Sequence, residues 1–262
     1  MDLGLRGRIA VVAAGSKGLG RAVALELAAE GADVAICARG MAALEDAASA
    51  IRALGVRAHV VAADVSESGA PERVIADAER ALGPVDIVVT NSGGPRSGRF
   101  ETLQPEDWDA ATRTLLSSAV GFARGAVPGM RARKWGRIIN ITSIAAKQPV
   151  DNLMLSNSLR SAVIAFAKTL SNEVAADGVT VNNLLPGYTR TERVTDLADQ
   201  LAASGNTTAA GVTARWEAEI PMRRLGEPAE FAALAAFLAS ARASYITGQS
   251  IAIDGGWIRN IL

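Results

Sequence analysis

Two hydrophobic patterns alternate along the chain, and together they predict its architecture. Short continuous apolar runs are typical of strands buried on both faces of a parallel sheet. Between them lie alanine-rich stretches whose apolar residues recur at helical spacing. The predicted strands are 9–14, 33–39, 57–64, 85–90, 136–142, 179–185 and 250–253, and the predicted helices are 21–30, 42–54, 71–82, 108–130, 158–176 and 229–240. This alternation predicts an α/β fold, a single-domain Rossmann-like, doubly wound parallel sheet flanked by helices.

One stretch departs from the alternation. Between Tyr188 and Pro221 the chain has a looser pattern, and its 203–213 piece is rich in Gly, Thr and Ala. In an open α/β sheet the ligand lies beyond the carboxyl ends of the strands. We therefore expect 190–221, which follows the sixth predicted strand, to form a lid over a substrate, with 203–213 as its most mobile part.

The first predicted strand ends in a glycine-rich turn before the first helix. Gly15, Gly18 and Gly20 let the backbone turn sharply and let a pyrophosphate approach the N–H groups at the start of that helix. Ser16, Lys17 and Leu19 complete this loop. Glycine also serves packing at strand-to-helix turns. The loop alone therefore leaves open both a phosphate site and a purely structural turn.

Charge and composition exclude several classes of partner. The 262 residues contain 27 Lys plus Arg and 27 Asp plus Glu, so no overall charge favours nucleic acid or an anionic membrane, and we expect neither partner. The N-terminus lacks an apolar signal segment, and no apolar run reaches the roughly 18 residues of a membrane span, which predicts a cytoplasmic protein. A single cysteine, Cys37, and a single histidine, His59, argue against a disulfide and against a Cys/His metal cluster. We expect no metal site.

Further motifs follow the later strands in order. They are Ala63-Asp64-Val65, Thr90-Asn91-Ser92-Gly93, Asn140-Ile141-Thr142-Ser143, Pro186-Gly187, Thr247-Gly248 and Asp254-Gly255-Gly256. Together with the glycine loop, this set resembles the short-chain dehydrogenase/reductases, in particular their 3-oxoacyl-carrier-protein-reductase-like branch. The resemblance covers nearly the whole chain. It implies a Rossmann domain that binds a nicotinamide dinucleotide and acts on a carbonyl or alcohol.

The resemblance also implies positions for the cofactor. Asp64 would contact the adenine, with Val65 beside it, and Asn91 and Gly93 would line the adenosine side. At the nicotinamide end the residues implied are those of the loop after the sixth strand, Pro186, Gly187, Thr189 and Thr191.

The charge near the end of the second strand indicates whether the dinucleotide is NAD(H) or NADP(H). A ribose 2′-hydroxyl is held by a carboxylate near the end of the second strand, whereas a 2′-phosphate requires a cation there. Arg39 lies at that end, and Lys17 lies in the glycine loop. Both side chains can pair with a phosphate, which favours NADP(H) over NAD(H). The alternative is that both are solvated surface charges.

The catalytic positions differ from those of the family. Family members use a serine, a tyrosine, a lysine and a helix asparagine, and the tyrosine acts as the acid whose pKa the lysine lowers. Ser143 matches the family serine, but the other three positions fall on Ser156, Arg160 and Leu115. A serine is a much weaker and shorter acid, and arginine releases no proton near neutral pH. The glycine loop also has Ala13-Ala14 where relatives have Thr-Gly; an alanine can adopt a negative φ there, but we expect weakened or shifted cofactor binding.

Two other side chains are candidate proton donors. Lys147 lies in the loop after Ser143, and Tyr188 follows Pro186-Gly187, although each can equally be a surface or packing residue. Three functions remain open: an NADP(H)-dependent ketoreductase-like enzyme with an atypical site, a non-redox isomerase or lyase, and an inactive nucleotide-binding or regulatory protein. The resemblance further implies a homo-oligomer, a tetramer or dimer, through helices 108–130 and 158–176, with a small-molecule substrate.

Overall fold

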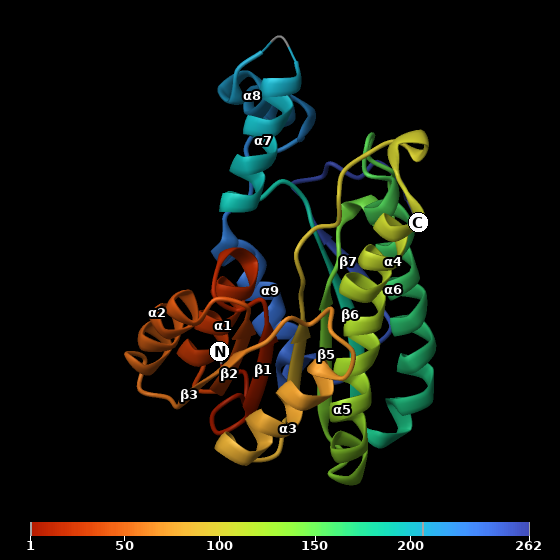
Figure 1. Ribbon diagram of the computed structural model, residues 1–262. Coiled ribbons are helices and arrows are strands. Elements are labelled where there is room, and N and C mark those ends of the chain that lie inside the picture. The colour runs from red at the N-terminus through yellow and green to blue at the C-terminus, as the bar shows by residue number, and fades with distance from the viewer. Residues whose placement is uncertain (1, 206, 262) are drawn as a thin grey trace.

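The computed structural model describes residues 2–205 and 207–261, and it confirms the predicted doubly wound sheet (Figure 1). Within these residues, seven strands form one parallel sheet in the order β3-β2-β1-β4-β5-β6-β7. The strands are β1 (Ile9–Ala13), β2 (Asp33–Ala38), β3 (Ala58–Ala62), β4 (Ile87–Thr90), β5 (Gly136–Ile141), β6 (Val179–Pro186) and β7 (Ser250–Ile253). Their order reverses between β1 and β4, and in open α/β sheets a ligand binds in the crevice beyond the carboxyl ends of the strands at such a switch point.

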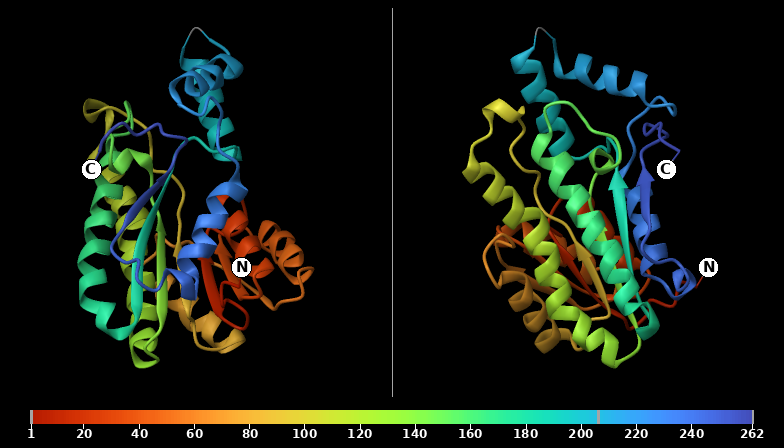
Figure 2. Two further views of the ribbon diagram at one scale, coloured as in Figure 1. Left: turned by 180° about the vertical axis from the view of Figure 1, so that it is seen from behind. Right: turned by 90° about the vertical axis from the view of Figure 1, so that its right-hand side faces the viewer.

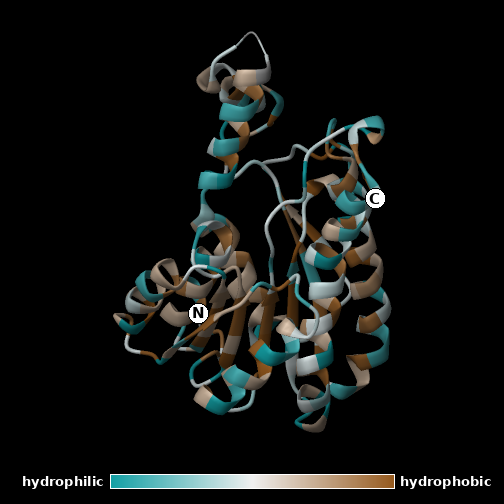
Figure 3. Cartoon of the chain, in the orientation of Figure 1, coloured by the Kyte–Doolittle hydropathy of each residue, from teal (hydrophilic) through white to brown (hydrophobic). Residues whose placement is uncertain are grey.

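Helices cover both faces of the sheet (Figure 2). One face carries α1 (Gly18–Ala29), α2 (Met41–Arg52) and α9 (Pro228–Ala239), and the other carries α3 (Ala70–Leu82), α5 (Ser118–Ala132) and α6 (Met154–Val174). The short helix α4 (Pro105–Thr112) precedes α5 and packs against α6. Apolar residues concentrate on the central strands, and polar ones lie on the outer helix surfaces (Figure 3).

The continuous apolar run of β1 follows from burial on both faces. Ala10 and Val12 pack with α1 and α9, whereas Val11 and Ala13 pack with the helices of the opposite face. Successive side chains of a strand point to opposite faces, so a strand between two helical layers requires an apolar residue at every position. All of β1 is buried.

The predicted helix 108–130 is interrupted. A π-helical turn, Arg113–Ser117, separates α4 from α5. The Ser118 hydroxyl donates to the Thr114 carbonyl at 2.5 Å, which satisfies an acceptor at this widened turn. Single π turns inside helices are frequent at functional sites, and Leu115 at the centre of this one is buried.

The expectation of a looser stretch between Tyr188 and Pro221 is wrong. The segment forms α7 (Glu192–Ser204) and α8 (Ala209–Glu219), which project beyond the carboxyl ends of the strands (Figure 1). Val194, Leu197 and Ala198 pack with Val212 and Trp216 in a small separate core. Residue 206, inside the predicted mobile piece, lies outside the described residues.

Candidate functional site

The glycine loop at the end of β1 is held by close backbone packing. The Gly15 N–H donates to the Cys37 carbonyl at 3.2 Å, and a Cβ atom on Gly15 would lie 2.7 Å from Ile36 Cγ2. A Cβ atom on Gly20 would lie 2.3 Å from the Ala14 carbonyl oxygen. Glycine is therefore required at both positions for packing alone.

Ala14 does not use the negative φ that is open to alanine. Its φ is +49°, in the left-handed region that disfavours residues with a Cβ atom. The tight turn that brings Gly15 against β2 fixes this conformation, whatever residue occupies position 14. The loop thus keeps its path at the expense of local backbone strain.

The remaining loop residues face α7 and the core. Lys17 forms an ion pair with Glu192 at 3.0 Å, and both side chains are exposed. A Cβ atom on Gly18 would lie 3.7 Å from Thr191 Cγ2. Leu19 packs against the core beneath the loop, and Ser16 is half-buried. The glycine loop therefore contacts the start of α7, which lies far from it in the sequence.

The ends of β2 and β3 bring Arg39 and Asp64 into one neighbourhood. The Ala63 N–H donates to the Ala38 carbonyl at 2.9 Å, so the two strand ends are adjacent. Asp64 accepts hydrogen bonds from the Ser66 hydroxyl at 2.7 Å and the Ser66 N–H at 2.9 Å. These bonds lower the pKa of Asp64, with a smaller contribution from the positive charge of Arg39. Arg39 is exposed, which leaves its guanidinium accessible to a ligand.

Val65 and the residues after β4 and β6 complete the positions predicted for a cofactor. Val65 packs on the core, Asn91 is half-buried and Gly93 is exposed, with nothing within 4 Å of the Cβ position of Gly93. Pro186 ends β6, and a Cβ atom on Gly187 would lie 2.7 Å from the Asp254 Cα atom. The Thr191 hydroxyl donates to the Thr189 carbonyl at 3.3 Å, within the turn that leads to α7. All these segments lie at the carboxyl ends of the strands.

A chain of buried polar side chains underlies the site, and sequence analysis did not identify it. The Thr90 hydroxyl donates to Asn140 Oδ1 at 2.7 Å, and Asn140 Nδ2 donates to Asn183 Oδ1 at 3.0 Å. Asn183 Nδ2 then donates to the Ser250 hydroxyl at 3.1 Å. The chain joins β4, β5, β6 and β7. Because buried polar groups in a low-dielectric core are held by their partners, it fixes the relative positions of these four neighbouring strands.

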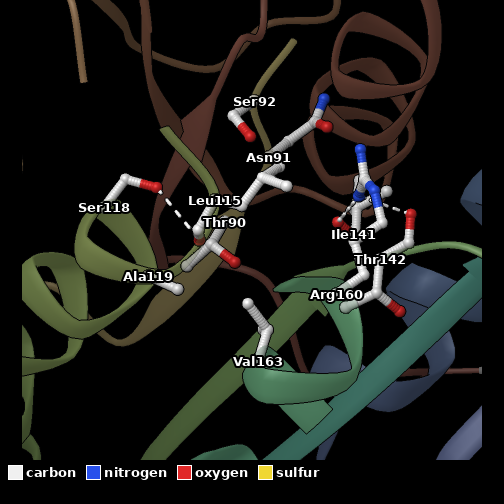
Figure 4. Close-up of a pocket in the computed structure, with 10 residues that line it drawn as sticks. All are labelled: Thr90, Asn91, Ser92, Leu115, Ser118, Ala119, Ile141, Thr142, Arg160 and Val163. Carbon is white, nitrogen blue, oxygen red and sulfur yellow. Dashed lines mark hydrogen bonds between the residues drawn. The ribbon is translucent and has the colours of Figure 1, made fainter. Parts of the chain in front are cut away.

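A small pocket opens between the ends of β4 and β5 and the helices α5 and α6 (Figure 4). Its lining residues are Thr90, Asn91, Ser92, Leu115, Ser118, Ala119, Ile141, Thr142, Arg160 and Val163. The half-buried Arg160 donates from Nη1 to the carbonyls of Ile141 at 3.2 Å and Thr142 at 2.6 Å. Burial, and secondarily the charge of Arg193, lower the pKa of Arg160 to about 10. Arg160 therefore stays charged at neutral pH.

The other predicted catalytic side chains lie in different environments. The Ser143 hydroxyl oxygen accepts a hydrogen bond from the Ala145 N–H at 3.1 Å, at the start of the short 3₁₀ helix Ile144–Ala146. Ser156 is 7% exposed, on the first turns of α6. Lys147 is exposed, and its carbonyl accepts a bond from Asn260 Nδ2 at 3.2 Å.

Tyr188 belongs to an aromatic cluster at the base of α7 and α8. Its ring stacks on Trp216 with a centroid separation of 4.6 Å and meets Trp257 edge-on at 6.1 Å. Burial, with the nearby Glu219 carboxylate, raises the pKa of Tyr188 to about 12. The ring thus serves packing of the α7–α8 segment, and its hydroxyl is a weaker acid than an ordinary tyrosine.

Residues 2–205 and 207–261 contain neither a cluster of metal ligands nor a membrane-spanning helix. In this part of the chain, no group of three or more His, Cys, Asp or Glu side chains is arranged to hold a metal ion. The same residues contain no helix with the length and apolarity needed to cross a bilayer. Cys37 is buried within β2, as expected for a small apolar residue, and burial raises the pKa of its thiol to about 12.

Comparison with known proteins identifies the family. The family model described as enoyl-(acyl carrier protein) reductase matches residues 13–258. Acetoacetyl-CoA reductase of Shinella zoogloeoides is 35% identical over 250 residues, 95% of this chain and 98% of that protein. The 3-oxoacyl-[acyl-carrier-protein] reductase FabG of Escherichia coli (strain K12) is 33% identical, over 97% of this chain and 98% of that protein.

Solved structures agree with these relatives. L-sorbose reductase from Gluconobacter frateurii, complexed with NADPH and L-sorbose, has a TM-score of 0.95 and 34% sequence identity, with 100% of both chains covered. Actinorhodin polyketide ketoreductase, solved as a variant with NADPH, has a TM-score of 0.92 and 29% identity, with 97% of this chain and 98% of that chain covered. These findings confirm the resemblance based on the motifs. The chain belongs to the short-chain dehydrogenase/reductase family and is a dehydrogenase/reductase-type enzyme similar to the 3-oxoacyl-[acyl-carrier-protein] reductases.

Proposed function

We propose that this protein is an NADP(H)-dependent, ketoreductase-like oxidoreductase that interconverts a carbonyl and an alcohol. The observation that carries the proposal is the glycine loop beside the switch point of the sheet, which leads into the start of α1, with Lys17 in the loop and Arg39 after the end of the adjacent strand β2. No side chain caps α1 at Lys17, so the first N–H groups of the helix are open to a phosphate. The NADPH-bound relatives support the same cofactor.

The chain's own residues fit this dinucleotide. Gly15, Ser16, Gly18, Leu19 and Gly20 would surround the pyrophosphate, and Asp64, Val65, Asn91 and Gly93 would border the adenosine. Pro186, Gly187, Thr189 and Thr191 would hold the nicotinamide end. Arg39 is exposed beside Asp64 and would pair with a 2′-phosphate. Lys17 reaches the same crevice, although it must release Glu192 to bind a phosphate.

The nicotinamide, when bound, supplies or accepts the hydride. Ser143 is proposed to polarise the carbonyl oxygen of the substrate. Because its oxygen already accepts the Ala145 N–H, its own hydroxyl hydrogen remains available for donation. Arg160 contributes a fixed positive charge to the pocket, and Ser156 is too weak an acid to protonate an alkoxide. The proton therefore comes from solvent or from Lys147, while Tyr188, with its raised pKa, is the poorer donor.

The segment 190–221 is proposed as the lid over the substrate. It consists of α7 and α8 above the strand ends, and the pair Lys17–Glu192 joins it to the glycine loop. Binding of a phosphate to Lys17 would compete with this pair and so connect cofactor binding to the position of α7. A homo-oligomer, dimer or tetramer, through α4–α5 and α6 is also proposed. Sedimentation that finds monomer alone would reject it. The cytoplasmic location stays a prediction.

One observation favours a second function. Leu115, at the centre of the π-helical turn, lines the pocket where the resemblance implies an asparagine. Together with Ser156 and Arg160, it supports a protein that binds the nucleotide but transfers no hydride, or one that performs an isomerase or lyase step. Both of these functions could use the polar residues that line the pocket at the ends of β4 and β5, Thr90, Asn91 and Thr142.

Calorimetric titration with NADPH and NADH tests the proposed cofactor. We expect NADPH to bind more tightly than NADH, and Arg39→Asp to reverse this preference, because a carboxylate repels the 2′-phosphate and accepts hydrogen bonds from a 2′-hydroxyl. Arg52→Asp, on the outer surface of α2, is the control for a general change in charge. Absence of binding by either nucleotide would refute the proposed function.

A further inference from the structure

Two arginines converge on the pocket without a carboxylate partner. Arg160 reaches it from α6, and its guanidinium donates only to the backbone carbonyls of Ile141 and Thr142 (Figure 4). Arg193 reaches the same region from the first turn of α7, because a Cβ atom built on Gly94 would lie 2.8 Å from Arg193 Nη2. In the described part of the chain, neither side chain makes an ion pair with an acid.

Two cations near Arg193, Lys17 and Arg190, form ion pairs with carboxylates. Lys17 pairs with Glu192 at 3.0 Å, and Arg190 pairs with Glu217 at 3.3 Å and with Glu227 at 3.0 Å. Arg193 lies between these pairs in the sequence, yet it turns toward Gly94 and Arg160. Among the cations at the start of α7, Lys17 and Arg190 are thus paired with carboxylates, whereas Arg193 turns toward the pocket.

Two guanidinium groups in such a position repel one another. The charge of Arg193 is felt at Arg160, where it adds to the effect of burial in lowering the pKa. Arg160 is half-buried and Arg193 is exposed, so solvent screens part of this repulsion, and an anion that enters between the two groups would offset the rest. A planar oxyacid group accepts two parallel N–H donors from each guanidinium. Carboxylates and phosphates both provide such oxygens.

We propose that Arg160 and Arg193 together bind an anionic oxyacid group between the end of β5 and the first turn of α7. This inference deepens the proposed function and rests on it for the origin of the anion. The group belongs either to the pyrophosphate of the cofactor or to a carboxylate on the carbonyl substrate. In the second case the substrate class is that of oxo acids.

The experiment compares Arg193→Gln with wild type by calorimetry, with Arg193→Lys as the conservative variant. Arg215→Gln is the matched control, since Arg215 is an exposed arginine on α8. Arg193 is itself exposed on α7, so its replacement leaves the fold intact, whereas Arg160 also holds two strand-end carbonyls. The probes are inorganic pyrophosphate, NADPH, and, in the presence of NADP⁺, acetoacetate and its uncharged methyl ester.

Loss of charged hydrogen bonds predicts an affinity decrease on the order of 10- to 100-fold for the bound anion. A decrease for pyrophosphate and NADPH supports the proposal and assigns the anion to the cofactor. A decrease for acetoacetate that spares methyl acetoacetate supports it and assigns the anion to the substrate. If Arg193→Gln changes no affinity more than Arg215→Gln does, the anion site is refuted.

The outcomes separate this inference from the proposed function. If wild type binds pyrophosphate in an Arg193-dependent manner but binds neither NADPH nor NADH, the anion site stands and the dinucleotide function is refuted. If NADPH binds with equal affinity to wild type and Arg193→Gln, and acetoacetate affinity is also unchanged, the function stands and the arginine pair is refuted.

Discussion

The left-handed conformation of Ala14 makes the substitution Ala14→Gly a sharp test of how the glycine loop is built. At φ +49° the alanine Cβ atom is crowded by the backbone, which costs roughly 1–2 kcal/mol. Glycine removes that strain but has a larger conformational entropy in the unfolded chain, which returns about 0.4–1 kcal/mol. We expect a net stabilisation of about 0.5–1 kcal/mol, or roughly 1–4 °C in the midpoint of thermal unfolding.

Unfolding in urea, followed by tryptophan fluorescence without added ligand, measures this effect. Ala53→Gly is the matched control, because Ala53 ends α2 with φ −62°, a conformation that alanine adopts without strain. The same replacement should there lower the free energy of unfolding by about 0.4–1 kcal/mol. The reasoning is refuted if Ala14→Gly destabilises the protein as much as Ala53→Gly does.

Three further predictions concern the site and its surroundings. Ser143→Ala should lower kcat on the order of 10²-fold in a steady-state assay of NADPH oxidation, because it removes a donor to the developing oxyanion. Ser143→Thr keeps the hydroxyl and should retain most of the activity. An unchanged kcat for the alanine variant would exclude Ser143 from the mechanism. Tyr188→Phe should change the rate of the chemical step by no more than about twofold relative to wild type, because a phenol whose pKa is raised to about 12 is a poor acid near neutral pH. A pH-dependent loss of that rate on the order of 10²-fold would instead identify Tyr188 as the proton donor. The hydrogen bonds from Arg224 lower the pKa of Glu230 from its ordinary value of about 4.5 to about 2. Their stabilisation is therefore fully present above about pH 4.5 and disappears as the pH falls to about 2. The midpoint of thermal unfolding measured across that range should fall less steeply for Glu230→Gln, and an equally steep fall would contradict this origin.

The sequence was sufficient to predict the sheet, because the central strands β1 and β4 are apolar runs that are buried along their whole length, while the edge strands β3 and β7 are partly buried runs of the same kind. The glycine loop and the motifs after each strand also predicted where the crevice lies. The π-helical turn could not be predicted, since residues 108–130 keep helical spacing on both sides of it. The helix α7 was missed although Val194, Leu197, Ala198 and Leu201 have helical spacing. The Gly-, Thr- and Ala-rich stretch 203–213 that follows it is typical of a loop and so favoured an irregular segment.

Side-chain partners were the least predictable part of the site. The conformation of Ala14 depends on the contact of Gly15 with Ile36, which is distant in the sequence. The buried chain from Thr90 through Asn140 and Asn183 joins strands that are neighbours only in the folded sheet. The polar residues inside these apolar strands could have indicated such a chain of hydrogen bonds, because a buried polar side chain needs a partner. Arg193 gave no signal, since an arginine early in a helix is usually a surface charge.

We propose that this chain transfers hydride with Ser156 and Arg160 at the positions where the resemblance implies a tyrosine and a lysine. The most direct measurement incubates the protein with NADPH deuterated at the transferable position of the nicotinamide and a set of ketones and oxo acids, and analyses the products by mass spectrometry. We expect an alcohol that carries one deuterium, formed by wild type and on the order of 10²-fold more slowly by Ser143→Ala. Tight binding of NADPH with no deuterium in any alcohol would contradict it and identify a nucleotide-binding protein without redox activity.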